Sequence, residues 1–279
     1  MESGKSGMIQ LNDGHSIPAV GLGVYLVEGQ DGIDAVAHAL RVGYRHIDTA
    51  QLYGNEAEVA AGIAASGVPR EEVFITSKIW NDNHGYDKAT ASVRESLRKL
   101  NTEYIDLMLI HSPLSEPESR KETWRALIDL QKEGVVRSIG VSNYGVHHLD
   151  ELLAAFDVVP AVNQLELHPY LQRTELVEYC KSKGIVLQAY SPLCKGFKFA
   201  DPDAVALAEP YAESGKTLAH LLLKWGLDQG YVVLPKSVTP SRIEANIDLF
   251  DFELLQATKD AFAAADEGFV TGWDPTEEP

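Results

Sequence analysis

Short apolar runs rich in β-branched residues alternate along this chain with longer amphipathic segments. Apolar runs of this kind are typical of parallel strands covered on both faces, and the amphipathic segments predict the covering helices. We expect strands at 44–48, 73–78, 105–111, 136–142, 161–166, 185–190, 231–234 and 247–250. We expect helices at 33–40, 56–65, 89–100, 121–132, 147–155, 174–183, 218–228, 242–246 and 254–264.

About eight such units predict an α/β fold whose strands close into a (β/α)8 TIM barrel, and not an open doubly wound sheet. Ahead of them, the turn signal Asn12-Asp13-Gly14 between two short apolar segments predicts an N-terminal β-hairpin that caps the barrel bottom. The helix at 254–264 is expected to end the fold. No change in composition marks a linker, so we expect one domain over 1–279, with peripheral tails at 1–7 and 267–279.

Composition narrows the classes of partner. The 279 residues are 45% hydrophobic with a mean hydropathy of -0.13, which supplies ample material for a core. A net charge of -17 without any basic cluster argues against nucleic acid, so an anionic ligand needs a local positive site. No apolar run is long enough for a bilayer, and the two cysteines suggest neither a metal site nor disulfides. We expect a cytoplasmic protein without a metal.

The segment 43–59 holds the first candidate chemistry. It begins as a strand that ends at Asp48 and becomes a helix after Asn55, which has Glu58 three residues on, as a capping box requires. Asp48 and Tyr53 therefore lie in a loop between a strand and a helix. The plain alternative is that Asp48 caps the backbone and Tyr53 is an interfacial tyrosine with a satisfied hydroxyl.

Polar groups also end nearly every other expected strand. In a barrel of this type the active site lies at the carboxyl ends of the strands, so these groups are expected at one rim. They are Asp48, Lys78, His111, Ser142, Asn143, Gln164, Glu166, Tyr190, Ser191, Lys236 and Ser237.

Four of these residues suggest one reaction. If Lys78 is drawn inward it needs an anion, and Asp48 is the candidate. A nearby ammonium stabilises a phenolate, so we expect Lys78 to lower the pKa of Tyr53, while His111 donates a hydrogen bond to the same substrate oxygen. Such a site reduces a carbonyl or oxidises an alcohol. Taken singly, Lys78 is equally read as a rim lysine and His111 as a core histidine.

The hydride must come from a cofactor, because no side chain supplies one. Gly21-Leu22-Gly23 is not a dinucleotide fingerprint, since it lacks the third glycine and the strand and helix around it. The segment 234–242 offers Lys236, Ser237, Thr239 and Arg242 at a helix start, which attracts phosphate. The alternative is a helix capped by Thr239 or Ser241 with a solvated arginine.

Several motifs together resemble the aldo-keto reductase family over residues 8 to 265. They are Ile47-Asp48-Thr49-Ala50, Tyr53-Gly54-Asn55-Glu56, Ile75-Thr76-Ser77-Lys78-Ile79-Trp80, Ile139-Gly140-Val141-Ser142-Asn143-Tyr144, Asn163-Gln164, Ala189-Tyr190-Ser191-Pro192-Leu193 and Pro235-Lys236-Ser237-Val238. The resemblance implies a monomeric barrel that reduces small-molecule aldehydes and ketones with NADPH, which becomes NADP+.

The resemblance also implies a role for each matched residue. Tyr53 is the general acid, tuned by Asp48 and Lys78, and His111 orients the carbonyl. Ser142, Asn143 and Gln164 hold the carboxamide, Tyr190 stacks on the nicotinamide, and Ser191 and Leu193 follow the pyrophosphate. Lys236, Ser237, Thr239 and Arg242 take the 2'-phosphate, and Asn246 takes the adenine.

The chain departs from the family pattern at three places. Ala245 stands where many relatives have Glu, Tyr25 where many have Trp, and Ser112 where an aromatic residue is frequent, whereas Trp80 is retained. The substrate pocket formed by Tyr25, Trp80 and Ser112 is therefore expected to be poor in aromatic walls, although Trp273 could reach its mouth.

Two other functions remain open at this point. A barrel that binds NADP(H) as a sensor and acts through a partner would keep the cofactor site but have less use for His111. A barrel hydrolase using carboxylates such as Asp48 and Glu166 lacks a convincing acid pair in one place.

Overall fold

A parallel sheet of eight strands forms the centre of the computed structural model, which describes residues 7–279. The strands are β3 (Leu22–Gly23), β4 (His46–Asp48), β5 (Phe74–Ile79), β6 (Ile105–Ile110), β7 (Val136–Ser142), β8 (Val162–Glu166), β9 (Val186–Tyr190) and β10 (Val232–Val233). They pair in chain order, and parallel bridges from Val20 to Val233 and from Gly23 to Lys236 join the two edges. The expected barrel is confirmed.

One strand of the barrel differs from the sequence prediction. Seven expected strands are present, but 247–250 is the last residue of a helix and the loop after it, and the remaining strand is β3. β3 was missed because it has two residues and ends in a glycine, so it shows no apolar run. The segment 247–250 was misread because Leu249 is fully buried in the core without any strand pairing.

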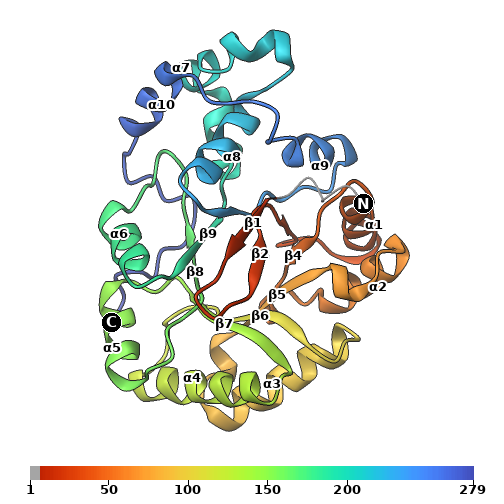
Figure 1. Cartoon of the computed structure of the whole chain (residues 1–279), viewed down its shortest axis with the longest axis vertical. Coiled ribbons are helices and arrows are strands. Elements are labelled where there is room, and N and C mark those ends of the chain that lie inside the picture. Colours follow the sequence, from red (N-terminus) through yellow and green to blue (C-terminus); the bar gives the residue numbers. More distant parts are fainter. Residues whose placement is uncertain (1–6) are drawn as a thin grey trace.

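The predicted hairpin is present at the bottom of the barrel. β1 (Met8–Gln10) pairs antiparallel with β2 (Ser16–Pro18), and Figure 1 shows both lying across the middle of the ring of strands. Leu11 and Ile17 pack against interior residues of the barrel such as Leu107 and Val232. The hairpin therefore closes the lower end of the interior with apolar side chains.

Helices surround the sheet and turn their apolar sides toward it. In α3, for example, Ala89, Val93 and Leu97 recur at helical spacing and are buried. The helices are α1 (Gly29–Arg41), α2 (Glu56–Ser66), α3 (Tyr86–Lys99), α4 (Pro117–Lys132), α5 (Val146–Ala155), α6 (Thr174–Ser182), α7 (Pro202–Ala206), α8 (Leu218–Asp228), α9 (Pro240–Ile247) and α10 (Gln256–Ala263). No helix within residues 7–279 is long and apolar enough to cross a membrane.

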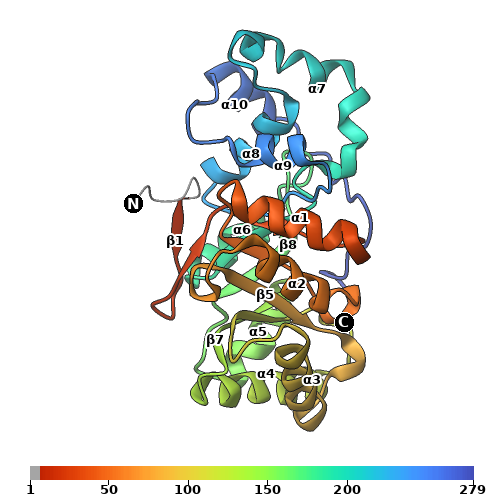
Figure 2. The ribbon, with the colours of Figure 1, turned by 90° about the vertical axis from the view of Figure 1, so that its right-hand side faces the viewer.

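The end of the chain lies on the opposite side from the hairpin, as Figure 2 shows. Residues 267–279, expected to be a peripheral tail, pack across the carboxyl ends of the strands. The Glu166 carboxylate accepts a hydrogen bond from the Thr271 backbone amide at 3.0 Å, and Arg173 pairs with Asp274 at 2.9 Å. A side chain at Gly145 would collide with the Thr276 carbonyl. Of the predicted tail 1–7, only Gly7 belongs to the described residues.

Candidate active site

The loop after β4 is held by Asn55, although not in the expected way. Its side chain makes no capping hydrogen bond with α2. Instead the Asn55 amide donates to the carbonyls of Val24 and Val27, each at 2.8 Å, and its oxygen accepts from the Thr49 hydroxyl at 2.6 Å. The capping box is therefore wrong, because these distant backbone carbonyls use the amide. Asn55 ties the loop that carries Tyr25 to the loop after β4.

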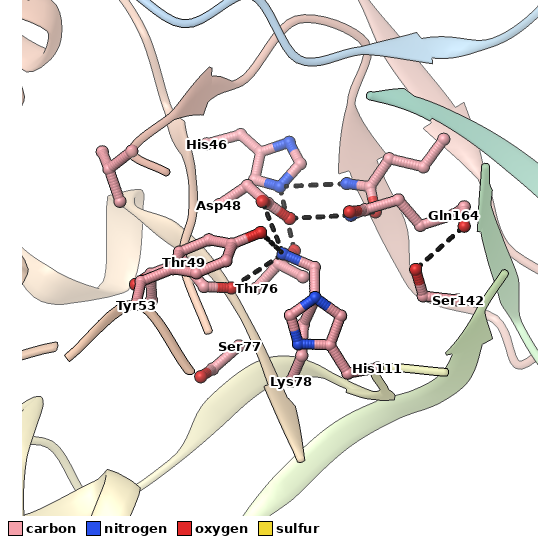
Figure 3. Close-up of polar contacts among 12 residues, drawn as sticks. His46, Asp48, Thr49, Tyr53, Thr76, Ser77, Lys78, His111, Ser142 and Gln164 are labelled. Atoms are coloured by element: carbon pink, nitrogen blue, oxygen red, sulfur yellow. Dashed lines mark hydrogen bonds and ion pairs between the residues drawn. The ribbon is translucent and has the colours of Figure 1, made fainter. Parts of the chain in front are cut away.

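Strand alternation explains why two charged side chains point into the barrel. His46 and Asp48 lie two apart on β4, as do Thr76 and Lys78 on β5, so each pair faces the same side of the sheet. Figure 3 shows the four side chains converging. The Lys78 ammonium donates to Asp48 Oδ1 at 2.6 Å and to the Thr49 carbonyl at 2.9 Å. The predicted ion pair is present and almost fully buried.

Tyr53 joins this pair through its hydroxyl. Lys78 Nζ lies 3.3 Å from the Tyr53 oxygen and donates to it. Burial, with smaller effects from the Asp48 carboxylate and Tyr25, raises the pKa of Tyr53 well above its ordinary value. The expected lowering of this pKa is wrong, because burial of the hydroxyl, and after it the Asp48 charge, outweigh the nearby ammonium. Tyr53 is thus a protonated phenol held beside an ammonium.

His111 ends β6 and faces the same place. Its ring centroid lies 5.8 Å from that of Tyr53 and 5.1 Å from that of Trp80. Burial, followed by the charge of Lys78, holds the pKa of His111 well below its ordinary value, so the ring is neutral. Nδ1 is buried without a hydrogen-bond partner among residues 7–279, which favours placing the single proton on Nε2, where it can be donated.

The ends of β7, β8 and β9 meet in a hydrogen-bonded cluster. Asn143, with a left-handed φ of 62°, donates to the His111 carbonyl and to Ser142 Oγ, each at 3.1 Å, and accepts from the Tyr190 hydroxyl at 3.0 Å. The Ser142 hydroxyl donates to the Gln164 carbonyl at 2.9 Å. Both amide protons of Asn143 are therefore used within the protein.

Gln164 connects this cluster to Asp48. Its Nε2 donates to Asp48 Oδ2 at 2.8 Å and to Gln188 Oε1 at 2.7 Å. Its own Oε1 makes no hydrogen bond within residues 7–279, so it is an open acceptor. The sequence reasoning missed Gln188, His46 and Thr76. Polar residues two positions before a strand end are the signal that could have found them.

The pocket beside Tyr53 has more aromatic walls than expected. Trp273, from the end of the chain, has its ring centroid 6.3 Å from that of Trp80 and 6.5 Å from that of His111. The Tyr25 ring lies 5.0 Å from that of Tyr53. The expectation of a pocket poor in aromatics is wrong, because Trp273 supplies a wall that the loops lack.

Ser112 does not line this pocket with its hydroxyl. The side chain is fully buried and donates to Asn81 Oδ1 at 2.7 Å, while its oxygen accepts from the Leu114 backbone amide. Its role is to fix the turn that follows β6. This corrects the assignment of Ser112 to the pocket.

The candidate phosphate site lies around the start of α9. Lys236 and Arg242 are exposed, and neither side chain makes a hydrogen bond or an ion pair with any of residues 7–279, although the chain carries a net charge of -17. Ser237 Oγ accepts from the Thr239 backbone amide at 3.1 Å. Thr239 is the residue before α9, but its side chain makes no cap bond. Two free cations at a helix start suit a phosphate group.

Two neighbouring positions bear on adenine binding. Asn246 is buried, and its side chain makes no hydrogen bond within residues 7–279, so it can bind a ligand. Glu244 instead contacts His38 of α1 at 3.0 Å and is engaged there. It does not stand in for the Glu that Ala245 replaces. Ser191 has a left-handed φ of 48° and Leu193 is half-buried, both beyond the end of β9.

The donors and acceptors together fit a nicotinamide dinucleotide phosphate. The open Gln164 oxygen lies beside the buried ion pair, and the free cations Lys236 and Arg242 lie beyond β10. The same site holds a phenol and a neutral imidazole that can both reach one substrate oxygen. This arrangement can hand a proton to a carbonyl oxygen.

Known proteins resemble the chain over almost its whole length. The family model described as "Aldo/keto reductase family" matches residues 19–267. Glyoxal reductase of Bacillus subtilis is 45% identical over 270 residues, 96% of each chain. Methylglyoxal reductase DkgA of Escherichia coli is 42% identical over 272 residues, 97% of each chain. An aldo-keto reductase from Bombyx mori in complex with NADP is 38% identical with a TM-score of 0.86, covering 97% of this chain and 96% of that one.

Proposed function

The chain belongs to the aldo/keto reductase family, and on this premise we propose that Tyr53 is the proton donor with which it reduces small carbonyl compounds. The protein is an oxidoreductase that converts aldehydes and ketones to alcohols with NADPH. NADPH, when bound, would supply the hydride for the carbonyl carbon. What the chain supplies is the binding of substrate and cofactor, the orientation of the carbonyl and one proton.

One observation carries the assignment of the proton donor. Tyr53, Lys78 and Asp48 form a continuous hydrogen-bonded series, with contacts of 3.3 and 2.6 Å, at the carboxyl ends of the strands. The Tyr53 proton passes to the substrate oxygen, and the Lys78 ammonium stabilises the phenolate that remains. Asp48 keeps Lys78 charged and in place. His111 Nε2 donates to the same oxygen and fixes the carbonyl.

We assign the cofactor contacts to the remaining polar groups. Gln164 accepts from the carboxamide through its open oxygen, and Asn143 has one oxygen lone pair left for the same group. Tyr190 is half-buried beside Asn143 and offers its ring as a stacking face. Ser142, which is hydrogen-bonded to both Gln164 and Asn143, is the third proposed contact with the carboxamide. Further along the cofactor, the proposed contacts are Ser191, Leu193, Lys236, Ser237, Thr239, Arg242 and Asn246.

The proposed substrates are small 1,2-dicarbonyl compounds. The two reductases from Bacillus subtilis and Escherichia coli are named for glyoxal and methylglyoxal. The aromatic walls formed by Tyr25, Trp80 and Trp273 narrow the space next to Tyr53, which favours a small planar substrate over a bulky one. Second choices are other short aldehydes.

An initial-rate assay tests this function. At fixed NADPH, we expect kcat/KM for methylglyoxal and glyoxal to exceed that for glucose and for bulky aromatic ketones by at least about tenfold. This ratio corresponds to a difference of about 1.4 kcal/mol in activation free energy. Tight NADPH binding without turnover of any carbonyl would instead favour the sensor. The intact set of Asp48, Tyr53, Lys78 and His111 argues against that alternative.

We also propose that one domain and one copy of the chain suffice. Every proposed catalytic residue comes from the same barrel, so a partner copy has no residue to add. Cys180 and Cys194 are both free and buried, which suits a reducing compartment such as the cytoplasm. Light scattering during gel filtration is expected to give the monomer mass of 30.6 kDa.

A further inference from the structure

A buried series of hydrogen-bonded side chains continues from Asp48 into the barrel, away from Tyr53. Gln164 Nε2 contacts both Asp48 Oδ2 and Gln188 Oε1, and Gln188 Nε2 lies 3.4 Å from His46 Nε2. His46 Nε2 lies 2.9 Å from the Thr76 hydroxyl. Asp48 is 4% exposed, Gln164 2%, and Gln188 and His46 0%, so the four side chains are shielded from bulk solvent.

The chemistry of Asp48 fixes the donor-to-acceptor direction of this whole series of hydrogen bonds. An ionised carboxylate only accepts, so the amide nitrogen of Gln164 must face it. The second proton of that nitrogen then requires an acceptor, which sets the oxygen of Gln188 toward Gln164. The Gln188 nitrogen is left to donate to His46 Nε2. That nitrogen must be an acceptor, shared with the Thr76 hydroxyl. The contacts of Nε2 therefore place the His46 proton on Nδ1, which is buried without a hydrogen-bond partner among residues 7–279.

The state of His46 agrees with this direction. Burial lowers the pKa of His46 to about 3, so the ring is neutral and Nε2 can accept. A protonated His46 would turn a donor toward the Gln188 nitrogen and break the series. With neutral His46, every contact in the series from Asp48 to His46 pairs a donor with an acceptor. The opposite orientation of Gln188 would place two donors against each other.

We propose that Gln188 is a positioning residue that acts through Gln164: by accepting from Gln164 Nε2, it holds this amide against the Asp48 carboxylate and fixes the direction of its cofactor-facing oxygen. The inference rests on the proposed function, because it concerns the same site. With both Gln164 amide protons bound, the amide cannot flip, so its free oxygen keeps one direction. Without Gln188, one Gln164 proton is left buried without an acceptor, and the amide rotates to find another partner.

Packing alone would not select glutamine at this place. In register, Gln188 is paired with Gln164 on β8 and Val232 on β10. The titratable groups facing it are His46 and Asp48 from β4, with Lys78 from β5 beyond Asp48, and β10 contributes none. An apolar side chain of equal volume would fill the space without burying a polar amide. If Gln188 only fills space, Q188M should be tolerated better than Q188E.

The positioning role predicts the opposite ranking. In Q188E, the glutamic acid is buried near Asp48 and stays neutral at pH 6. Its carbonyl oxygen accepts from Gln164 and its hydroxyl donates to His46, as the glutamine amide does. In Q188M, both links are lost while the volume is kept.

The test measures NADPH affinity by quenching of tryptophan fluorescence, together with kcat for methylglyoxal, both at pH 6. We expect Q188M to weaken NADPH binding and to lower kcat by about tenfold each, and Q188E to stay within about twofold of wild type. Thermal unfolding checks that both variants fold, and Q188E alone decides if Q188M does not. The proposal is overturned if Q188M matches wild type or if Q188E is impaired at pH 6.

This test separates the two proposals. The affinity readout needs no turnover, so the variants can be ranked even if no carbonyl is reduced. If wild type binds NADPH without turnover, the proposed function fails while the ranking still tests Gln188. If wild type turns over and Q188M equals it, only the role of Gln188 fails.

Discussion

The Lys78 ammonium lies 2.6 Å from the Asp48 carboxylate, and the two side chains are 0% and 5% exposed. Burial raises the pKa of Asp48 and lowers that of Lys78, so the attraction between them works against desolvation. A pair of this kind contributes little net stability, because removing two charges from water offsets most of the attraction. Its place beside Tyr53 fits the catalytic role that we propose for the pair.

Breaking this pair from one side should destabilise the fold. Lys78→Met leaves Asp48 buried without its cation, and we expect a cost of about 3 to 5 kcal/mol, or roughly 10 °C in Tm. The double variant Lys78→Met with Asp48→Asn, which buries no charge, should recover at least half of that loss. Differential scanning calorimetry measures both. A double variant less stable than Lys78→Met would contradict this account of the pair.

Removing the Tyr53 hydroxyl should abolish proton donation and leave binding intact. Tyr53→Phe keeps the ring against Tyr25 and His111, so we expect kcat to fall by about 10² to 10⁴. The dissociation constant for NADPH, measured by fluorescence, should change by less than about threefold. Tyr86→Phe, which removes an exposed hydroxyl from α3, is the matched control. Full turnover by Tyr53→Phe would remove Tyr53 from the mechanism.

The ends of the strands made most of the site predictable. Once the apolar runs place parallel strands in a barrel, Asp48, Lys78 and His111 must meet at one rim, because all carboxyl ends lie there. Period-two alternation then decides that Asp48 and Lys78 both face the interior. No long-range contact has to be known for this step.

What failed depended on contacts between distant parts of the chain. Asn55 was read as a cap from its neighbours, but the carbonyls of Val24 and Val27 bind its amide. Trp273 was named as a residue that could reach the mouth of the pocket, but its approach to Trp80 joins residues far apart in the chain, and no local pattern fixes it. The direction of the Tyr53 pKa shift depended on how deeply the hydroxyl is buried and on the Asp48 charge beside it, and both require coordinates.

The free cations before and within α9 should set the choice of cofactor. A charge-assisted hydrogen bond contributes about 1.5 to 3 kcal/mol, so Arg242→Ala should weaken NADPH binding by roughly ten- to a hundredfold. NADH, which lacks the 2'-phosphate, should lose much less. Arg125→Ala, at an exposed arginine of α4, serves as the control for net charge. Equal losses for NADPH and NADH would show that Arg242 does not bind this phosphate.

The buried His46 should make the fold less stable in acid. Burial lowers its pKa in the folded protein to about 3, whereas an unfolded histidine titrates near about 6.5. Between these values the unfolded chain binds a proton that the folded chain does not, so the free energy of unfolding falls as the pH falls. Because of His46 alone, the free energy of unfolding should be about 2 kcal/mol lower at pH 5 than at neutral pH. Buried His84, with a pKa lowered to about 4, acts in the same direction.

Replacing His46 isolates its share of this effect. His46→Gln keeps polar atoms near Thr76 but cannot titrate, so its loss of stability between pH 7 and pH 5 should be smaller than that of wild type by about 2 kcal/mol. Urea unfolding followed by circular dichroism at the two pH values gives the difference. His15→Gln, at an exposed position on the hairpin side, should leave the wild-type difference nearly unchanged. If His46→Gln shows the same loss as wild type, the buried ring takes up its proton in the folded state, and the donor series from Asp48 to His46 does not hold as drawn.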